Sequence, residues 1–388
     1  MESDPHMKAI LNGHILLPDR EIKGKALLYD EKITGFTDEK SASREARETI
    51  DAEGAYVSPG LIDVHIHGYA GMDVSDGNAD SIRKMAQYLL QNGVTGFLPT
   101  SMTASWDKLE NICNHVRGLM EESDSPAFSG AQVLGMHMEG PFINPTKKGA
   151  QSQEYILLPD AKKVLPFADV IRVITYAPEM PGGMDFTRTL LDKTSIALSI
   201  GHTSATYDQA LEIIRQGVKR VTHLFNAMTG LHHRDPGVVG AALTTDVYTE
   251  LIADTFHVNK ALFPLITEIK GDKLVLITDA VCFAGMPDGE YDNDGQNFIV
   301  KGIECRLKDG TIAGSVLRLN NAVKNLCNYA CLPMYQAVRA ASLNAAESVN
   351  LAQCKGSLTP GKDADIVLLG DDCQVLRTIV KGTTKYMA

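Results

Sequence analysis

Short apolar runs alternate with amphipathic stretches through the middle of the chain. The amphipathic stretches, such as ADSIRKMAQYLLQNG and YDQALEIIRQG, have the apolar spacing of helices. The apolar runs are typical of strands buried on both faces, as in a parallel sheet covered by helices. Eight such runs alternating with helices predict an α/β fold, a (β/α)8 TIM-like barrel. The expected strands lie in YVSPGLIDVHIH, GVTGFLPTSM, AQVLGMHMEG, VIRVITYAPE, SIALSIGHTS, RVTHLFNAM, TELIADTFH and KLVLITDA.

Both ends of the chain have a different pattern. Short β-like runs separated by charged turns fill residues 8–57, and the C-terminal stretches KGSLTPGKDADIVLLG and QVLRTIVKGTTKYM are similar. We therefore expect a small β-sandwich domain formed by both chain termini. The predicted boundaries are 1–59 and 351–388 for the sandwich and 60–350 for the barrel. Residues 1–7 (MESDPHM) lack the apolar core of a signal peptide, and we treat them as a cloning remnant.

Composition narrows the class of protein. Hydrophobic residues make up 44% and charged residues 22%, as in soluble globular enzymes. The net charge of −11 argues against binding to nucleic acid, and no apolar run is long enough to cross a membrane. Seven cysteines without a CxxC pair indicate reduced thiols and a cytoplasmic location.

Titratable side chains gather where the expected strands end. His65 and His67 share one face of their strand, because side chains at i and i+2 point the same way. By itself this HxH pair fits two hydrogen-bonded core histidines as well as it fits metal ligands. The other strand ends favour ligation, because active sites of such barrels lie at the carboxyl ends of the strands. Those ends supply Glu139, His202, His223, His257 and Asp279, with His137 as a weaker candidate beside Glu139.

Imidazole and carboxylate groups are a common ligand set for divalent transition metals. Glu139, His202 and His223 make a three-ligand set that leaves a position open for water, whose pKa a metal lowers to about 7. Asp279 could be a helix N-cap, but near such a water it could accept a proton and pass it on. We favour this catalytic role for Asp279.

The motifs that carry this chemistry also carry a family resemblance. The sequence resembles the amidohydrolase superfamily and, within it, the N-acetylglucosamine-6-phosphate deacetylases. HxH and the strand-end His and Asp are shared by the superfamily, whereas HMEGPF, THLFNAM and HHRDPG are narrower. The matching segments are PGLIDVHIHG, HMEGPFINPTKKGAQ, GHTSA, THLFNAM, HHRDPGVVGAAL, LIADTFH, LITDA, TIAGS and GSLTPGKDADIV.

The resemblance implies a barrel with a β-sandwich and one or two divalent ions, for which Zn, Fe, Mn and Co are all suitable. Glu139, His202 and His223 match the ligands of the catalytic metal, and Asp279 matches the acid/base aspartate. His65 and His67 make a second metal plausible, with Glu139 bridging and Asp279 near both ions. The implied reaction is hydrolysis of the acetamide of N-acetyl-D-glucosamine 6-phosphate to D-glucosamine 6-phosphate and acetate, in amino-sugar catabolism.

The resemblance also implies how the sugar phosphate is bound and how the chain assembles. Gln151 stands where many family members have a histidine that polarises the amide carbonyl. Family members are commonly homodimers, and the HHRDPG loop is then in a position to reach a neighbouring site. The implied substrate-binding residues are Ala150, Gln151, Asn226, Ala227, Arg234, His257, Ala313, Gly314 and Ser315.

Two other classes of function remain open from the sequence. One is an amidohydrolase that acts on a different N-acetylated sugar or a cyclic amide, or a deaminase. The other is a non-catalytic barrel used for binding, against which the intact ligand set argues.

Overall fold

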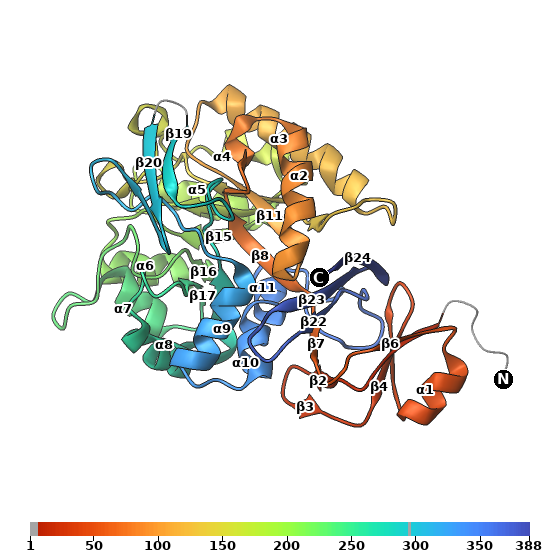
Figure 1. Ribbon diagram of the computed structural model, residues 1–388. Helices are drawn as coiled ribbons and strands as arrows, with labels where there is room; N and C mark the ends of the chain where they lie inside the picture. Colours follow the sequence, from red (N-terminus) through yellow and green to blue (C-terminus); the bar gives the residue numbers. More distant parts are fainter. Residues whose placement is uncertain (1–6, 294–295) are drawn as a thin grey trace.

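A parallel barrel of eight strands forms the centre of the molecule. The computed structural model describes residues 7–293 and 296–388, so the first six residues of the expected cloning remnant lie outside the described part. The strands pair in parallel in chain order, and a bridge between Ile66 and Ala280 joins the first to the segment after the last. This confirms the predicted (β/α)8 architecture (Figure 1). The strands are β8 (Leu61–Ile66), β11 (Val94–Ser101), β13 (Met136–Glu139), β14 (Ile171–Tyr176), β15 (Ala197–Ile200), β16 (Arg220–Val221), β17 (Tyr248–Ile252) and β18 (Leu274–Ile277), with β12 (Gln132–Val133) preceding β13 on the same side of β11.

Helices surround the barrel because each has one apolar face. In α6, for example, Thr206 and Gln209 form a reciprocal capping box at the start, and Ala210 and Ile213 are buried against the strands. None of the helices in the described part of the chain is both long and apolar enough to span a membrane. The helices of the barrel are α2 (Ala79–Leu89), α3 (Trp106–Ser123), α4 (Ala161–Val164), α5 (Gly183–Lys193), α6 (Tyr207–Arg215), α7 (Gly237–Thr244), α8 (Phe263–Lys270), α9 (Leu319–Tyr329), α10 (Met334–Ala340) and α11 (Leu343–Ser348).

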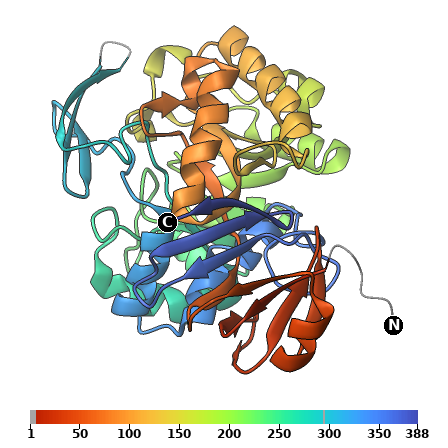
Figure 2. The same ribbon diagram turned by 45° about the vertical axis from the view of Figure 1, so that its right-hand side comes forward.

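Two sheets built from both ends of the chain form the small sandwich (Figure 2). Its apolar core contains Ile10 and Val57 from the N-terminal part and Ile366 and Ile379 from the C-terminal part. The predicted sandwich is therefore confirmed, while its residue boundaries stay predictions. One sheet has the order β5 (Ile33–Thr37), β4 (Ala26–Tyr29), β1 (Lys8–Leu11), β6 (Glu48–Asp51), and the other β24 (Thr383–Met387), β23 (Val375–Val380), β22 (Ile366–Leu369), β7 (Tyr56–Pro59), β2 (His14–Leu16), β3 (Glu21–Ile22).

The run YVSPGLIDVHIH, expected as one strand, divides at Gly60 into β7 of the sandwich and β8 of the barrel. A side chain at Gly60 would collide with Thr95 of β11, since a Cβ there would lie 2.1 Å from the threonine hydroxyl. The glycine therefore lets the chain pass closely from one domain into the other.

Two features were not anticipated from the sequence. Helix α1 (Glu39–Glu45) is capped by Asp38 and lies in the sandwich. An antiparallel sheet of β19 (Gly289–Asn293), β20 (Gln296–Lys301) and β21 (Glu304–Leu307) follows β18 and stands beside the mouth of the barrel, where β9 (Gly68–Tyr69) and β10 (Met72–Asp73) also pair. Figure 1 shows the first of these sheets in cyan.

Candidate metal centre and active site

The strand-end residues singled out from the sequence lie together at the carboxyl end of the barrel. His65 lies within β8, Glu139 ends β13, and His67, His202, His223 and Asp279 follow their strands by one or two residues. These six residues are buried. His257, the remaining strand-end candidate, lies five residues after the end of β17.

Three of these residues have unusual backbone conformations. His202, His223 and Asp279 have φ angles of 46°, 28° and 49°, in the left-handed region that non-glycine residues avoid. Each follows a short, buried strand whose pairing fixes where the chain must turn. Such strain persists only where the surrounding structure imposes it, and it is concentrated at functional sites.

One cluster, the glutamate site, consists of Glu139, His202 and His223. Glu139 Oε1 lies 3.2 Å from His202 Nε2 and 3.1 Å from His223 Nε2. The two Nε2 atoms are 3.1 Å apart. The structure therefore brings the predicted three-ligand set together.

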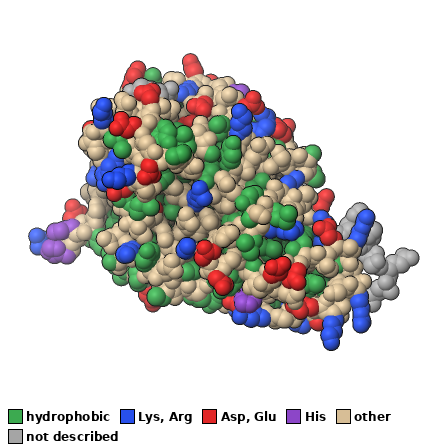
Figure 3. Space-filling model, viewed as in Figure 1, with side chains coloured by type: hydrophobic (Ala, Val, Ile, Leu, Met, Phe, Trp, Pro, Cys, Tyr) green, Lys and Arg blue, Asp and Glu red, His purple; other side chains and the backbone are tan. Residues whose placement is uncertain are grey.

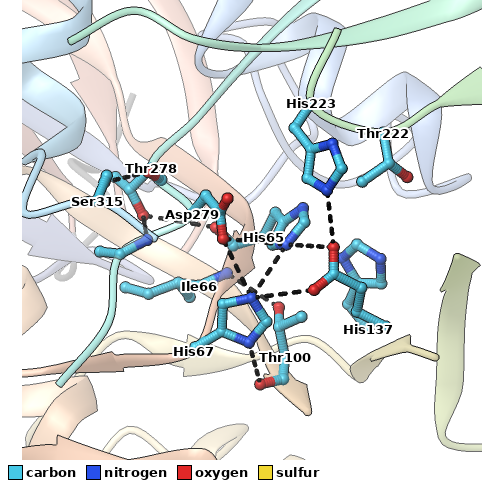
Figure 4. Close-up of polar contacts among 12 residues, drawn as sticks. His65, Ile66, His67, Thr100, His137, Thr222, His223, Thr278, Asp279 and Ser315 are labelled. Carbon is cyan, nitrogen blue, oxygen red and sulfur yellow. Dashed lines mark hydrogen bonds and ion pairs between the residues drawn. The ribbon is translucent and has the colours of Figure 1, made fainter. Parts of the chain in front are cut away.

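A second cluster, the HxH site, consists of His65, His67 and Asp279. The two Nε2 atoms are 3.3 Å apart, and Asp279 Oδ1 lies 3.1 Å from His67 Nε2 and 3.5 Å from His65 Nε2. Glu139 is shared, because its Oε1 and Oε2 lie 3.4 Å and 3.3 Å from His65 Nε2 and His67 Nε2. Figure 4 shows the side chains of His65, His67 and Asp279 pointing toward one another.

The hydrogen bonds made by Nδ1 determine the tautomer of the imidazole rings, and therefore which nitrogen faces the clusters with a free lone pair. Carbonyl oxygens of Thr100 and Lys147 lie 3.1 Å and 2.8 Å from Nδ1 of His67 and His202. A carbonyl only accepts, so Nδ1 carries the proton and Nε2 presents its lone pair to the cluster. Lone pairs and carboxylates that face one another repel unless a cation lies among them. The nitrogen and oxygen donors are those that divalent transition metals take, so both clusters fit a metal ion.

The pKa values of the cluster residues also indicate that the site favours positive charge. Burial alone would lower the pKa of His67, but hydrogen bonds and charges of Asp279 and Glu139 raise it to about 9. Burial would raise the pKa of Glu139, yet His65 and His202 hold it well below its usual range. The pKa of Asp279 is likewise lowered by His65 and His67 against the effect of burial. The carboxylates are thus kept ionised.

A cavity of about 660 Å³ opens above the two clusters. Its wall is formed by the segments after β11, β13, β16 and β18 and by the sheet of β19 and β20. Seven of the nine predicted substrate-binding residues line it: Ala150, Gln151, Asn226, Ala227, His257, Ala313 and Gly314.

Gln151 and His257 are held in defined orientations at this wall. Gln151 Oε1 accepts from the Thr103 backbone N–H at 2.6 Å, and Gln151 Nε2 donates to Glu139 Oε2 at 2.6 Å. His257 Nδ1 lies 2.6 Å from Asp254 Oδ2, so its Nε2 is the nitrogen left for a ligand. Both residues can therefore meet polar groups of a molecule in the cavity.

The other two predicted substrate-binding residues do not line the cavity. Ser315 is fully buried, and its backbone N–H donates to the Asp279 carbonyl at 2.9 Å, so it supports the turn that carries Asp279. Arg234 is exposed in the loop between β16 and α7, with Nη1 2.7 Å from His233 Nε2. This loop projects from the molecule at the left of Figure 1, and histidine and basic side chains lie at its tip in Figure 3.

Comparison with known proteins agrees with this geometry. The model of the amidohydrolase family matches residues 56–385. The chain belongs to the amidohydrolase family. It is 35% identical over 367 residues to N-acetylglucosamine-6-phosphate deacetylase of Bacillus subtilis, covering 93% of this chain and 92% of that protein.

Two further proteins are similar to this amidohydrolase. The N-acetylgalactosamine-6-phosphate deacetylase of Escherichia coli O157:H7 is 35% identical over 337 residues, covering 86% of this chain and 88% of that protein. The crystal structure of N-acetylglucosamine-6-phosphate deacetylase from Pasteurella multocida superposes with a TM-score of 0.92 at 31% identity, covering 98% of this chain and 100% of that one.

His137, the weaker candidate, is not free to bind a metal in this amidohydrolase. Its Nδ1 lies 3.0 Å from the Val64 carbonyl and its Nε2 2.7 Å from Thr175 Oγ1. Burial lowers the pKa of His137 to about 3, so the ring is neutral. It packs edge-on against His65 with ring centroids 4.5 Å apart and supports that ring instead.

Reasoning from the sequence missed two charged residues below the two donor clusters of this amidohydrolase. Glu250 lies within β17 and Arg220 within β16, both fully inside the barrel. The sequence did indicate that these two residues are unusual, because each is a charged residue inside a strand expected to be buried. A buried charge without a partner costs free energy. The sequence does not show which residues of neighbouring strands lie beside each other. It therefore could not predict the ion pair between Arg220 and Glu250.

Replacing both His65 and His67 with alanine should lower the number of bound metal ions per chain by one, because the glutamate site keeps its three candidate ligands. Elemental analysis of the purified variant measures this ratio. His115→Ala, on helix α3 away from the barrel mouth, is the matched control and should keep the wild-type ratio. An unchanged ratio in the double variant would mean that the HxH pair does not hold an ion.

Proposed function

We propose that this chain hydrolyses the acetamide of N-acetyl-D-glucosamine 6-phosphate, giving D-glucosamine 6-phosphate and acetate in amino-sugar catabolism. The observation that carries the proposal is the placement of the two donor clusters beneath a cavity lined by Gln151, Asn226 and His257. Full-length similarity to deacetylases of this class supports it.

Two divalent ions, of Zn, Fe, Mn or Co, are the metal content that we propose. Glu139, His202 and His223 would hold one ion, and His65, His67 and Asp279 would hold the other; the Glu139 carboxylate faces both groups of side chains. Such ions supply an acidified water molecule and polarise a carbonyl group. The cysteines in the described part of the chain are all free thiols, which supports a reducing location such as the cytoplasm.

Asp279 is the proposed acid/base group. Its side chain lines the cavity, and the surrounding histidines keep the carboxylate ionised. An ionised carboxylate at this place can accept the proton of the attacking water and deliver it to the departing amine. The two transfers leave Asp279 as it began.

Gln151 is proposed to steady the amide carbonyl of the substrate. Because Thr103 fixes its amide oxygen, its NH2 group faces Glu139 and the cavity. One N–H is used by Glu139, and the second is available to the carbonyl oxygen as negative charge develops on it. Glutamine does not titrate near neutral pH, so this donor works without a protonation step.

The groups that bind the sugar phosphate come from two places in this proposal. His257 supplies a ring nitrogen from within the chain. Arg234 is exposed on a projecting loop outside its own cavity, which supports a homodimer in which this arginine serves the neighbouring chain. Arginine suits this role because its fork binds phosphate through paired hydrogen bonds.

A second candidate substrate is N-acetyl-D-galactosamine 6-phosphate, which the equally similar E. coli relative favours. The two sugars differ only in the orientation of one hydroxyl group. Cyclic-amide hydrolysis, deamination and a non-catalytic binding role have no comparable support, and the complete donor clusters argue against the last of these.

Steady-state kinetics on protein of measured metal content tests the substrate. We expect kcat/KM for N-acetylglucosamine 6-phosphate to exceed that for unphosphorylated N-acetylglucosamine by about 100-fold, because charge-assisted hydrogen bonds to phosphate contribute about 1.5–3 kcal/mol each. N-acetylgalactosamine 6-phosphate and a cyclic amide are the comparison substrates. Equal values with and without phosphate would contradict phosphate recognition, and faster turnover of the galactose epimer would establish the second candidate.

Asp279→Asn should retain the fold and the ion of the glutamate site but lose about 10²–10⁴-fold in kcat, because asparagine cannot take up the proton. Turnover, thermal unfolding and metal content are measured together. Asp208→Asn, on the exposed face of α6, is the matched control. Near-normal turnover by Asp279→Asn would rule out the acid/base role.

Mixing two impaired chains tests the role of Arg234. Arg234→Ala alone should lose about 10–100-fold in kcat/KM with the 6-phosphate, because it removes a charge-assisted contact. Co-expression with Asp279→Asn should restore about a quarter of the wild-type activity, since random pairing in a twofold dimer completes one site in each mixed dimer. Arg188→Ala, on the surface of α5, should behave as wild type. Absence of complementation would mean that Arg234 does not act on the neighbouring chain.

A further inference from the structure

A line of buried polar groups runs from the base of the barrel to the HxH site. Ser348, at the end of α11, bonds with Arg220 Nη1. Arg220 Nη2 donates to Glu250 Oε1 at 2.5 Å, and Glu250 Oε2 lies 3.0 Å from His65 Nδ1. All four side chains are buried, and Arg220 and Glu250 are each only 1% exposed.

Burying this pair of charged side chains costs free energy, so its presence needs an explanation. Barrel interiors are filled mainly by branched apolar side chains, and a buried ion pair often adds no stability over an apolar pair of similar size. Arg220 and Glu250 lie on adjacent strands β16 and β17, where two apolar residues would complete the core. The stability of the fold therefore gives no sufficient reason for the pair.

His65 differs from the other metal-site histidines in what holds its Nδ1. His67 and His202 meet neutral carbonyl oxygens, and the Nδ1 of His223 has no partner among the described residues. Only His65, within these four, meets a carboxylate. A carboxylate fixes the Nδ1–H tautomer most firmly and also makes Nε2 a stronger electron donor to a metal.

The Nδ1 atoms of the four histidines therefore have different hydrogen-bond partners, and the strongest acceptor faces His65 of the HxH site. We propose that Glu250, held in place by Arg220, is a positioning residue that fixes the tautomer and orientation of His65 and thereby allows the HxH site to take up its ion. This rests on the two-metal form of the proposed function. In this role Arg220 holds one oxygen of the Glu250 carboxylate by a hydrogen bond, so that the other oxygen is directed at His65.

A purely structural role has to be distinguished, because Glu250 Oε2 also accepts the backbone N–H of His223 at 3.2 Å. Removing Glu250 alone would also leave the charge of Arg220 buried without a partner, which is strongly destabilising. Both members of the pair are therefore changed together in the test. One double variant keeps the hydrogen-bond acceptor and the other removes it.

The acceptor is kept in Arg220→Met/Glu250→Gln, because the glutamine oxygen can still accept from His65 Nδ1. It is lost in Arg220→Met/Glu250→Leu, which has a similar volume and no buried charge. The surface pair Arg83→Met/Glu122→Leu makes the same chemical change between α2 and α3, where the ion pair joins Arg83 Nη2 and Glu122 Oε2 at 2.7 Å. Thermal unfolding and circular dichroism establish that each variant folds.

Metal titration of the metal-free proteins with Co²⁺ gives the main result. The leucine variant should bind the ion of the HxH site about 10–100-fold more weakly than wild type, the usual effect of losing a group that supports a metal ligand. The glutamine variant should bind it with an affinity between those two, and the ion of the glutamate site should stay bound in both. The surface control should match wild type.

Nitrogen-15 spectra of the metal-free proteins give an independent readout. The Nδ1–H proton of His65, assigned with His65→Gln, should give a hydrogen-bonded signal in wild type and in the glutamine variant, and that signal should be lost in the leucine variant. This measurement needs neither metal nor turnover.

Four results would overturn the proposal. Three concern the variants: wild-type affinity for both ions in the leucine variant, equal weakening in the glutamine and leucine variants, and equal loss of both ions. The fourth is a wild-type protein that takes up a single ion. Deacetylation of N-acetylglucosamine 6-phosphate, measured on the same wild-type sample, shows separately whether the proposed reaction holds.

Discussion

The mouth of the barrel is organised by the repulsion among groups that face one another there. Nε2 atoms of four histidines and the carboxylates of Glu139 and Asp279 lie within 3.5 Å of their nearest neighbours. Hydrogen bonds behind the rings of His67 and His202 turn their lone pairs inward. Such a cluster is stable only with positive charge inside it, whether protons or metal ions. The high pKa of His67 and the low pKa of Glu139 express this requirement.

The rest of the fold keeps these groups in place. His202, His223 and Asp279 occupy the left-handed backbone region, at a cost of about 1–3 kcal/mol each. Neighbouring strands and turns impose these conformations, as where Ser315 donates its N–H to the carbonyl of Asp279. The large apolar core between strands and helices stabilises the fold and offsets the free-energy cost of this backbone strain. The barrel therefore acts as a rigid support for a cluster that would not assemble by itself.

The two donor clusters and the cavity wall come from different parts of the molecule. The cluster residues come from the strands and the first residues after them, whereas the cavity wall comes from longer loops and the sheet of β19 and β20. In a chain of net charge −11, a phosphate group can be bound only by a few locally placed donor groups. His257, held by Asp254, lies at the wall, and Arg234 lies on a loop directed away from it. Loop variation can thus change the sugar that is accepted without disturbing the metal centre.

The sequence by itself determined the alternation of strands and helices, the sandwich made from both termini and the residues at the strand ends. It could do so because buried strands and amphipathic helices leave their periods in the chain, and because barrel strands present their carboxyl ends on one side. Only the tertiary structure decided which groups meet. Glu139 faces both clusters, His137 has both nitrogens occupied, and Arg234 lies outside its own cavity. The ion pair of Arg220 with Glu250 and the sheet of β19 to β21 also appeared only there. These features depend on strand register, on turns and on side-chain directions, which arise from contacts between residues far apart in the chain and leave no local pattern.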